Sequence, residues 1–226
     1  MIWDIWVRLG HWCIVALVAF QLYSGEDLDL REQHAWVGIA ILSWVVFRIG
    51  WGMIGPRHAR FSDFVASPRA VIQSLRRLIA KQHHPAIGHS AAGGAGILLL
   101  IGLLGLMGIT GLVSTDDVFY DGPLNHWVSG SVAGIATEIH GLAKPALLLI
   151  VLAHVSAVLW HQFALKERLI QAMVHGRGSA VDHSITPAMT RRGAYLLLAS
   201  VILILGGLLG WGQFYTLKRK CTPSPS

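Results

Sequence analysis

Two histidines, His140 and His154, are spaced so that each could hold a metal-containing group inside one helix bundle. At 100° per residue, fourteen residues fall about 40° short of four full turns, so both side chains leave nearly the same helix face. Their axial separation is about 21 Å, because each residue advances a helix by about 1.5 Å. One metal ion does not bridge that distance. The spacing therefore predicts two separate centres, one toward each end of the helix.

The elements that must position these histidines are membrane-spanning helices. Of the 226 residues, 54% are hydrophobic and 13% are charged, whereas a soluble domain carries about a quarter charged residues. This composition excludes a soluble enzyme, a disordered chain and a nucleic-acid-binding domain with a basic surface. A span needs about 20 mostly apolar residues, and five stretches qualify: roughly 6–24, 34–54, 94–114, 138–162 and 193–215. We expect an all-α integral membrane protein, with a four-helix bundle and a fifth, C-terminal transmembrane helix.

The charges of the connecting segments predict the orientation of these helices. Residues 25–33 and 115–137 are mainly acidic, whereas residues 55–93 and 163–192 are mainly basic. Basic loops remain on the cytoplasmic side of a membrane. We therefore expect a cytoplasmic N-terminus, with the two acidic segments on the outside.

A short amphipathic helix is predicted within the first basic segment. Val71, Leu75, Leu78 and Ile79 recur at helical spacing between arginines. Such a helix suits the surface of the anionic inner leaflet. The alternative is a helix that packs against its own bundle, and the sequence leaves both interpretations open.

Each of the two centres needs a second ligand from another helix. The expected levels in the membrane pair His11 with His154, and His34 with His140. Intramembrane polar residues are costly and usually functional, and two imidazoles without a neighbouring carboxylate or thiolate favour bis-histidine haem over zinc. Because the chain has no C-x-x-C-H motif, the haem would be non-covalent b type. The alternative for each histidine is an ordinary bundle residue, bonded to a backbone carbonyl or a serine.

Cationic side chains near these levels are candidates for binding haem propionates. Arg48 lies fourteen residues after the histidine of the second stretch, on the same face but at the inner level. An arginine within a span costs several kcal/mol, so it needs an anionic partner or must extend to the interface. Arg8 is a second candidate for the inner haem. Lys144 and Arg31 are candidates for the outer one.

Several segments together resemble the bacterial cytochrome b561 family, closest to the branch that includes the cytochrome b subunit of nickel–iron hydrogenases. The segments that carry the resemblance are Trp3–Trp12, His34–Gly38, Gly55–Phe64, Gly88–Gly94, Ser114–Asp117 and Glu138–His140. The resemblance covers about residues 3–178. We therefore expect a di-haem membrane domain at 1–178, followed at 179–226 by a linker, the fifth transmembrane helix and a short tail.

The resemblance implies two b haems bound from the first, second and fourth helices, at the positions of His11, His34, His140 and His154. It also implies electron exchange between membrane quinone and a periplasmic partner, such as a c-type cytochrome or a hydrogenase-like subunit. The chain would then be the electron-transfer subunit of a quinone-linked oxidoreductase in the bacterial inner membrane. His89 is a candidate for lining a quinone site, and capping the third helix is the equal alternative.

Two other functions are compatible with intramembrane histidines. One is a transporter that uses them as a path for protons or metal ions, and the other is a membrane anchor subunit of a redox complex. Proton relays usually employ intramembrane Asp and Glu, and these are nearly absent from the apolar stretches. Electron transfer is therefore the favoured interpretation.

Overall fold

The computed structural model describes residues 5–55, 59–80, 90–116 and 120–176, and six positions of the C-terminal part, at 195, 198, 199, 201, 202 and 206. Within these ranges the secondary structure is helical, and the only β-type pairing is an isolated bridge between Thr115 and Asp121. The predicted all-α fold is confirmed. Most of the predicted fifth helix, at 193–215, lies outside the described residues.

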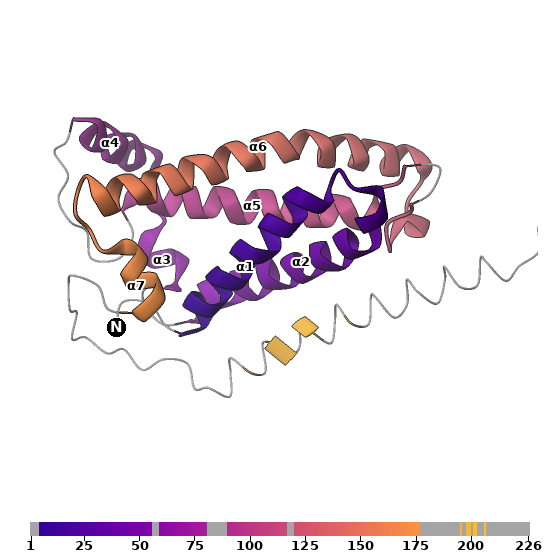
Figure 1. Ribbon diagram of the computed structural model, residues 1–226, viewed down its shortest axis with the longest axis horizontal. Coiled ribbons are helices and arrows are strands. Elements are labelled where there is room, and N and C mark those ends of the chain that lie inside the picture. The colour runs from indigo at the N-terminus through magenta and orange to yellow at the C-terminus, as the bar shows by residue number, and fades with distance from the viewer. Residues whose placement is uncertain are drawn as a thin grey trace, which may run out of the picture.

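Four long helices are apolar enough to cross a membrane, as the sequence predicts. They are α1 (Ile5–Ser24), α2 (Arg31–Ile54), α5 (Ala91–Val113) and α6 (Gly130–Phe163), and the 3-10 helix η1 (Leu28–Leu30) leads directly into α2. Figure 1 shows the four helices running side by side along the long axis of the molecule. In chain order each packs against the next, α1 on α2, α2 on α5 and α5 on α6.

The core of the bundle is formed by aliphatic side chains from all four long helices. Its buried members are Ile14, Ile41, Val45, Ile101, Leu104 and Leu147. On the outside, large apolar side chains of α6, including Leu142, Leu149 and Phe163, are exposed. A soluble protein seldom leaves such a continuous apolar surface open. This distribution suits a bundle whose outer surface faces lipid.

Helix α6 begins eight residues earlier than the apolar pattern predicts. The hydroxyl of Ser129 accepts a hydrogen bond from the Val132 amide and caps the helix at Gly130. With 34 residues, α6 is about 51 Å long, which exceeds the hydrocarbon thickness of about 30 Å. The sequence signal marked only the apolar part of the helix, whereas the cap determines its start.

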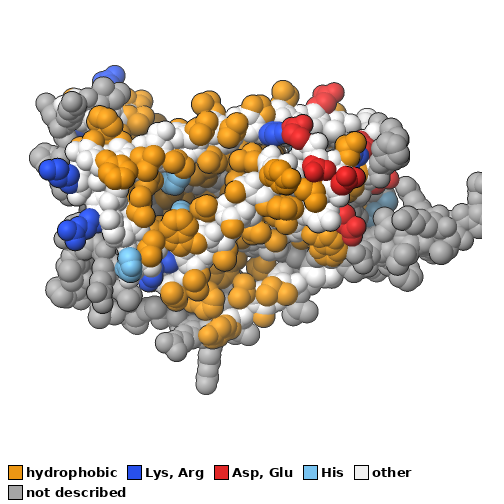
Figure 2. All heavy atoms as spheres, in the orientation of Figure 1, with side chains coloured by type: hydrophobic (Ala, Val, Ile, Leu, Met, Phe, Trp, Pro, Cys, Tyr) orange, Lys and Arg blue, Asp and Glu red, His pale blue; other side chains and the backbone are white. Residues whose placement is uncertain are grey.

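Three short helices lie at the end of the bundle where α1 begins (Figure 1). They are α3 (Phe61–Phe64), α4 (Pro68–Ile79) and α7 (Leu169–His175). The predicted amphipathic helix is confirmed as α4, which Ser67 caps and Pro68 opens. Figure 2 shows Lys and Arg side chains at this end, whereas Asp and Glu gather at the opposite end, near the 3-10 helix η3 (Asn125–Trp127). The charge asymmetry of the sequence is thus an asymmetry between the two ends of the bundle.

Candidate cofactor site

A cavity of about 530 Å³ lies among α1, α2, α5 and α6, toward the acidic end of the bundle. This volume lies within the range of roughly 300–1,000 Å³ that is typical of small-molecule and cofactor sites. The side chains that line it are mainly apolar. Its polar and glycine lining includes Gln21, Ser24, Arg31, His34, Gly38, Gly108, Gly111, Thr137, His140 and Lys144.

His34 from α2 and His140 from α6 meet at this cavity. Their ring centres lie 6.4 Å apart, and the ring planes are inclined by 71°. A metal bound by two opposing imidazole nitrogens at about 2 Å each separates the ring centres by roughly 6 to 6.5 Å. The spacing of these two rings therefore fits one shared iron between them.

The Nδ1 atoms of both histidines have polar partners at the wall of the cavity. Nδ1 of His140 lies 3.0 Å from the Met107 carbonyl oxygen and 3.2 Å from the hydroxyl of Thr110. Because a carbonyl only accepts, this Nδ1 carries the proton and leaves the lone pair on Nε2. Nδ1 of His34 lies 3.0 Å from the Ser24 hydroxyl, and Ser24 is 1% exposed. Metal-binding histidines are usually oriented in this way through the nitrogen that does not bind the metal.

Glycines of α5 allow this close arrangement. A Cβ at Gly111 would lie 3.3 Å from Cε1 of His140, and one at Gly108 would lie 3.0 Å from Leu42. At Gly25, after the end of α1, a Cβ would lie 3.5 Å from Cε1 of His34. Small residues at helix interfaces let neighbouring backbones approach. Here Gly108 permits the approach of Leu42, and Gly111 leaves room for the imidazole of His140.

His11 and His154 form the second pair, at the basic end of the bundle. Both are half-buried, and they are close enough to interact electrostatically. Nδ1 of His11 is buried and has no hydrogen-bond partner in the described part of the chain. A buried imidazole nitrogen without a partner is costly, and a polar or metal-containing group bound there would offset that cost.

Arg48 is buried within the bundle and does not extend to the interface. It is 6% exposed, and its guanidinium carbon lies 5.2 Å from the centre of the Phe61 ring. A cation over an aromatic face is stabilised by the ring quadrupole. Gly52 makes room for this ring, because a Cβ there would lie 2.4 Å from Phe61. The structure thus places a positive charge inside the bundle, toward its basic end.

Arg8 binds the end of a short helix. Its Nε donates to the Met173 carbonyl at 3.3 Å, and its Nη2 donates to the Val174 carbonyl. These carbonyls belong to the last turn of α7, where a cation is favoured by the helix dipole. Arg8 therefore joins the start of α1 to α7, and its role toward a propionate stays a prediction.

Lys144 lines the cavity that holds His34 and His140, and it pairs with Glu26, which follows α1. The hydrogen bond from Lys144 lowers the pKa of the Glu26 carboxyl. The cavity therefore has a cation at its wall that is already shared with an exposed carboxylate.

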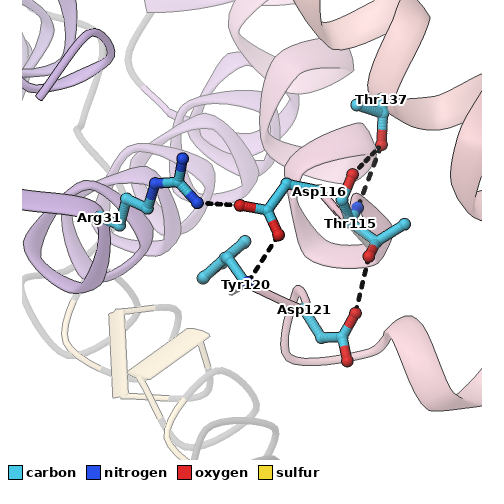
Figure 3. Close-up of polar contacts among 6 residues, drawn as sticks. All are labelled: Arg31, Thr115, Asp116, Tyr120, Asp121 and Thr137. Atoms are coloured by element: carbon cyan, nitrogen blue, oxygen red, sulfur yellow. Dashed lines mark hydrogen bonds and ion pairs between the residues drawn. The ribbon is translucent and has the colours of Figure 1, made fainter. Parts of the chain in front are cut away.

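A second ion pair closes the acidic end of the same cavity (Figure 3). Arg31 points toward Asp116 and pairs with it, and Asp116 also accepts a hydrogen bond from the Tyr120 amide at 2.7 Å. Thr137 of α6 exchanges hydrogen bonds of 3.1 and 3.0 Å with the backbone of Thr115. Burial, and secondarily the neighbouring Asp121, raises the pKa of Tyr120 to about 12. These contacts hold Thr115, Asp116 and Tyr120 at the wall of the cavity.

The model of the prokaryotic cytochrome b561 family matches residues 2–176 of the chain. The chain belongs to the prokaryotic cytochrome b561 family. A cytochrome b562 from Cereibacter sphaeroides is 28% identical over 185 residues, covering 74% of this chain and 91% of that protein. No solved structure gives a significant match. As a cytochrome b561, the protein is a multi-pass membrane cytochrome b, for which the family implies haem b binding and electron transfer.

The two predicted histidine pairs of this cytochrome b561 are brought together by the fold, whereas other candidates have different surroundings. His89 lies outside the described residues. His161, on the same stripe of α6 as His154, has its Nδ1 2.7 Å from a Glu167 carboxylate oxygen. In the described ranges, no cluster of three or more His, Cys, Asp or Glu side chains could form a metal cage. The two histidine pairs are therefore the candidate donors among the described residues.

Sequence reasoning about this cytochrome b561 missed the groups that orient the histidines. Ser24, Thr110 and the carbonyl of Met107 contact the imidazoles from outside the α2–α6 pair. No spacing rule connects them to His34 or His140. The available signal is chemical, since a hydroxyl within an otherwise apolar helix needs a partner.

Proposed function

We propose that this chain is a di-haem b-type cytochrome that passes electrons between the quinone pool and a periplasmic redox partner. In this proposal His34 and His140 bind one haem b, and His11 and His154 bind the other. The observation that carries it is the 6.4 Å separation of the His34 and His140 rings at a cavity of suitable volume. Each haem, when bound, supplies a one-electron carrier.

At the outer site, the residues of the chain hold the two imidazoles in place. The Met107 carbonyl keeps the proton of His140 on Nδ1, so that Nε2 is free to bind a metal. The hydroxyl of Ser24 orients the His34 ring through its Nδ1. A haem held by both His34 and His140 would supply electron transfer rather than the binding of oxygen or small ligands. Lys144 and Arg31 are the cations that would neutralise propionates there.

At the inner site, Arg48 is the principal candidate for binding a propionate. A buried guanidinium over Phe61 lacks bulk water, and a carboxylate in such a place forms strong, charge-assisted hydrogen bonds with it. Arg8 is the second candidate, from the first turns of α1. His11 and Arg8 lie three residues apart and so share one side of that helix.

The two ends of the bundle suggest its orientation and its partner. Positive residues gather at the end that holds α4 and α7, and acidic residues gather at the other (Figure 2). The positive-inside rule then places the N-terminus in the cytoplasm of the bacterial cell. The acidic outer end suits a partner with a basic surface, because opposite charges steer association. A c-type cytochrome or a hydrogenase-like subunit fits this description.

The di-haem domain would extend over residues 1–178, with residues 179–226 forming a linker, a fifth transmembrane helix and a tail. The quinone would bind near the inner haem, where the basic segments lie. His89 is the candidate residue for that site. The similarity to a cytochrome b562 over nearly the whole of that protein supports the extent of the domain.

Reduction by a quinol in proteoliposomes tests this function. We expect a lipophilic quinol to reduce the b haems, and a soluble oxidised c-type cytochrome on the acidic side to reoxidise them. His11→Ala, which alters the inner site, should abolish reduction by quinol but not reduction by dithionite. If the wild-type haems are reduced by dithionite and never by a quinol, the proposed link to the quinone pool is wrong.

A further inference from the structure

Helix α4 is divided into three sides with different environments. At 100° per residue, Ala70, Val71, Ser74 and Leu78 fall on one side, and these residues are less exposed than their neighbours. This side packs against α5, where the Ser74 hydroxyl accepts a hydrogen bond of 3.5 Å from the Ala92 amide. One side of α4 is therefore fixed to the bundle.

The second side of α4 is apolar and uncovered. Ile72 is 50% exposed and Leu75 is 46% exposed, and their side chains point about 60° apart, next to the packed side. A large aliphatic side chain that is exposed to water forgoes the free energy of burial. The packing of α4 on α5 thus leaves an apolar edge that needs an apolar partner.

The third side of α4 is basic and adjoins the apolar edge. Arg69, Arg76 and Arg77 are exposed and lie within about 100° of one another around the helix, with Gln73 between them. Arg69 and Arg76 share nearly the same direction and lie about 10 Å apart along the axis. Guanidinium groups bind phosphate oxygens in bidentate geometry.

The position of α4 in the fold places these sides at a membrane boundary. The helix packs against the first turn of α5, which begins a membrane span at Ala91. A helix at that level, with an apolar edge beside a basic side, has the pattern of a helix lying in the plane of the interface. Figure 1 shows α4 beside the end of the long helices.

We propose that α4 is a binding site for anionic phospholipids. Ile72 and Leu75 enter the acyl region, while Arg69, Arg76 and Arg77 bind lipid phosphates. An anionic phospholipid offers an acyl chain to the apolar edge and a phosphate to the basic side, and α4 lies at the start of a membrane span, where such lipids are found. This site is independent of the histidine pairs and of the proposed electron transfer.

Native mass spectrometry of the purified full chain, titrated with phosphatidylglycerol or phosphatidylcholine, measures how tightly each lipid binds. Each basic residue near an anionic surface contributes about 1 kcal/mol, so Arg69→Gln/Arg76→Gln should weaken phosphatidylglycerol binding roughly 30-fold and leave phosphatidylcholine binding unchanged. The matched control is Lys166→Gln/Arg168→Gln, which removes two exposed charges beside α7. An equal loss in both double variants, or none in the α4 variant, would overturn the proposal.

Spin labels test the depth of α4 without altering its charge. In a Cys13→Ser/Cys221→Ser background, a label at Ile72→Cys should collide with dissolved oxygen more than with a polar nickel chelate in phosphatidylglycerol vesicles. A label at Gln73→Cys, on the basic side, should show the opposite preference. If both labels prefer the nickel chelate, α4 lies in water and the proposed lipid site does not exist.

Discussion

The imidazoles of His34 and His140, which are 106 residues apart in the sequence, lie 6.4 Å apart between ring centres in the fold. Nδ1 of His34 contacts the Ser24 hydroxyl. Nδ1 of His140 contacts the Thr110 hydroxyl and the Met107 carbonyl oxygen. A pair of histidines that served only to satisfy the bundle would need these hydrogen bonds but not the close approach of the two rings at a cavity. The short distance between these two rings is therefore the basis for proposing that His34 and His140 bind one haem together.

Removing one outer ligand should remove one haem. We expect His34→Ala and His140→Ala each to lower the content from two haems per chain to one, because the inner site lies about 21 Å away along α6 and has its own ligands. Pyridine haemochrome analysis of the purified variants measures this. His126→Ala alters a histidine of the acidic-end loop and should keep two. Two haems in either outer variant would show that the pairing is wrong.

The hydroxyl partners of the histidines should tune haem affinity. Groups that orient a metal ligand typically account for 10- to 100-fold in metal affinity, so we expect Ser24→Ala and Thr110→Val to lose outer haem more readily during purification. Ser43→Ala is the matched control, since its hydroxyl bonds only the Ile39 carbonyl of the same helix. Haem transfer to apomyoglobin gives the rates. Equal rates in all three variants would contradict the orienting role.

Lys144 should raise the reduction potential of the outer haem. The cation lines that cavity, and a positive charge favours the form that has gained an electron, so Lys144→Gln should lower the potential on the order of tens of millivolts. Lys166→Gln, at the opposite end, should leave it unchanged. Redox titration monitored by absorbance measures both. An unchanged outer potential in Lys144→Gln would place the lysine away from the haem.

The ion pair between Lys144 and Glu26 predicts that the reduction potential of the outer haem depends on pH. Because Lys144 lowers the pKa of Glu26, the ion pair is complete at pH values above the ordinary pKa of a carboxyl group. It is lost as the pH falls through the lowered pKa of Glu26. Protonation of Glu26 leaves the lysine charge uncompensated, so the outer potential should rise toward acid pH. Glu26→Gln should show the raised potential at neutral pH. A Glu26→Gln potential equal to wild type would contradict this coupling.

Tyr120 should limit stability in alkali. Its pKa is about 12 in the folded protein against an ordinary 10.0, so its contribution is complete below pH 10 and is lost as the pH rises through about 12. Tyr120→Phe should therefore lose less thermal stability than wild type between these values. Tyr23→Phe, which removes an exposed phenol near the end of α1, is the control. Identical losses in wild type and Tyr120→Phe would contradict the assignment.

The sequence predicts those features that depend on periodicity and composition. The four membrane helices follow from apolar length, and the shared face of His140 and His154 follows from helical geometry. The prediction that His34 pairs with His140 required only that both residues lie at the same depth in the membrane. By contrast, the packing of Phe61 on Arg48 and the attachment of Arg8 to α7 depend on short helices outside the spans. Such tertiary contacts leave no periodic signal, and the early start of α6 depends on the single cap at Ser129.

The central claim is that four histidines bind two b haems in one chain. The most direct measurement is the haem-to-protein ratio of the purified wild-type chain, combined with its reduced-minus-oxidised spectrum at low temperature. We predict two haems b per chain, with two resolvable α-band components, one of which disappears in His140→Ala and the other in His11→Ala. A wild-type chain with a single haem, or with none, would contradict the account.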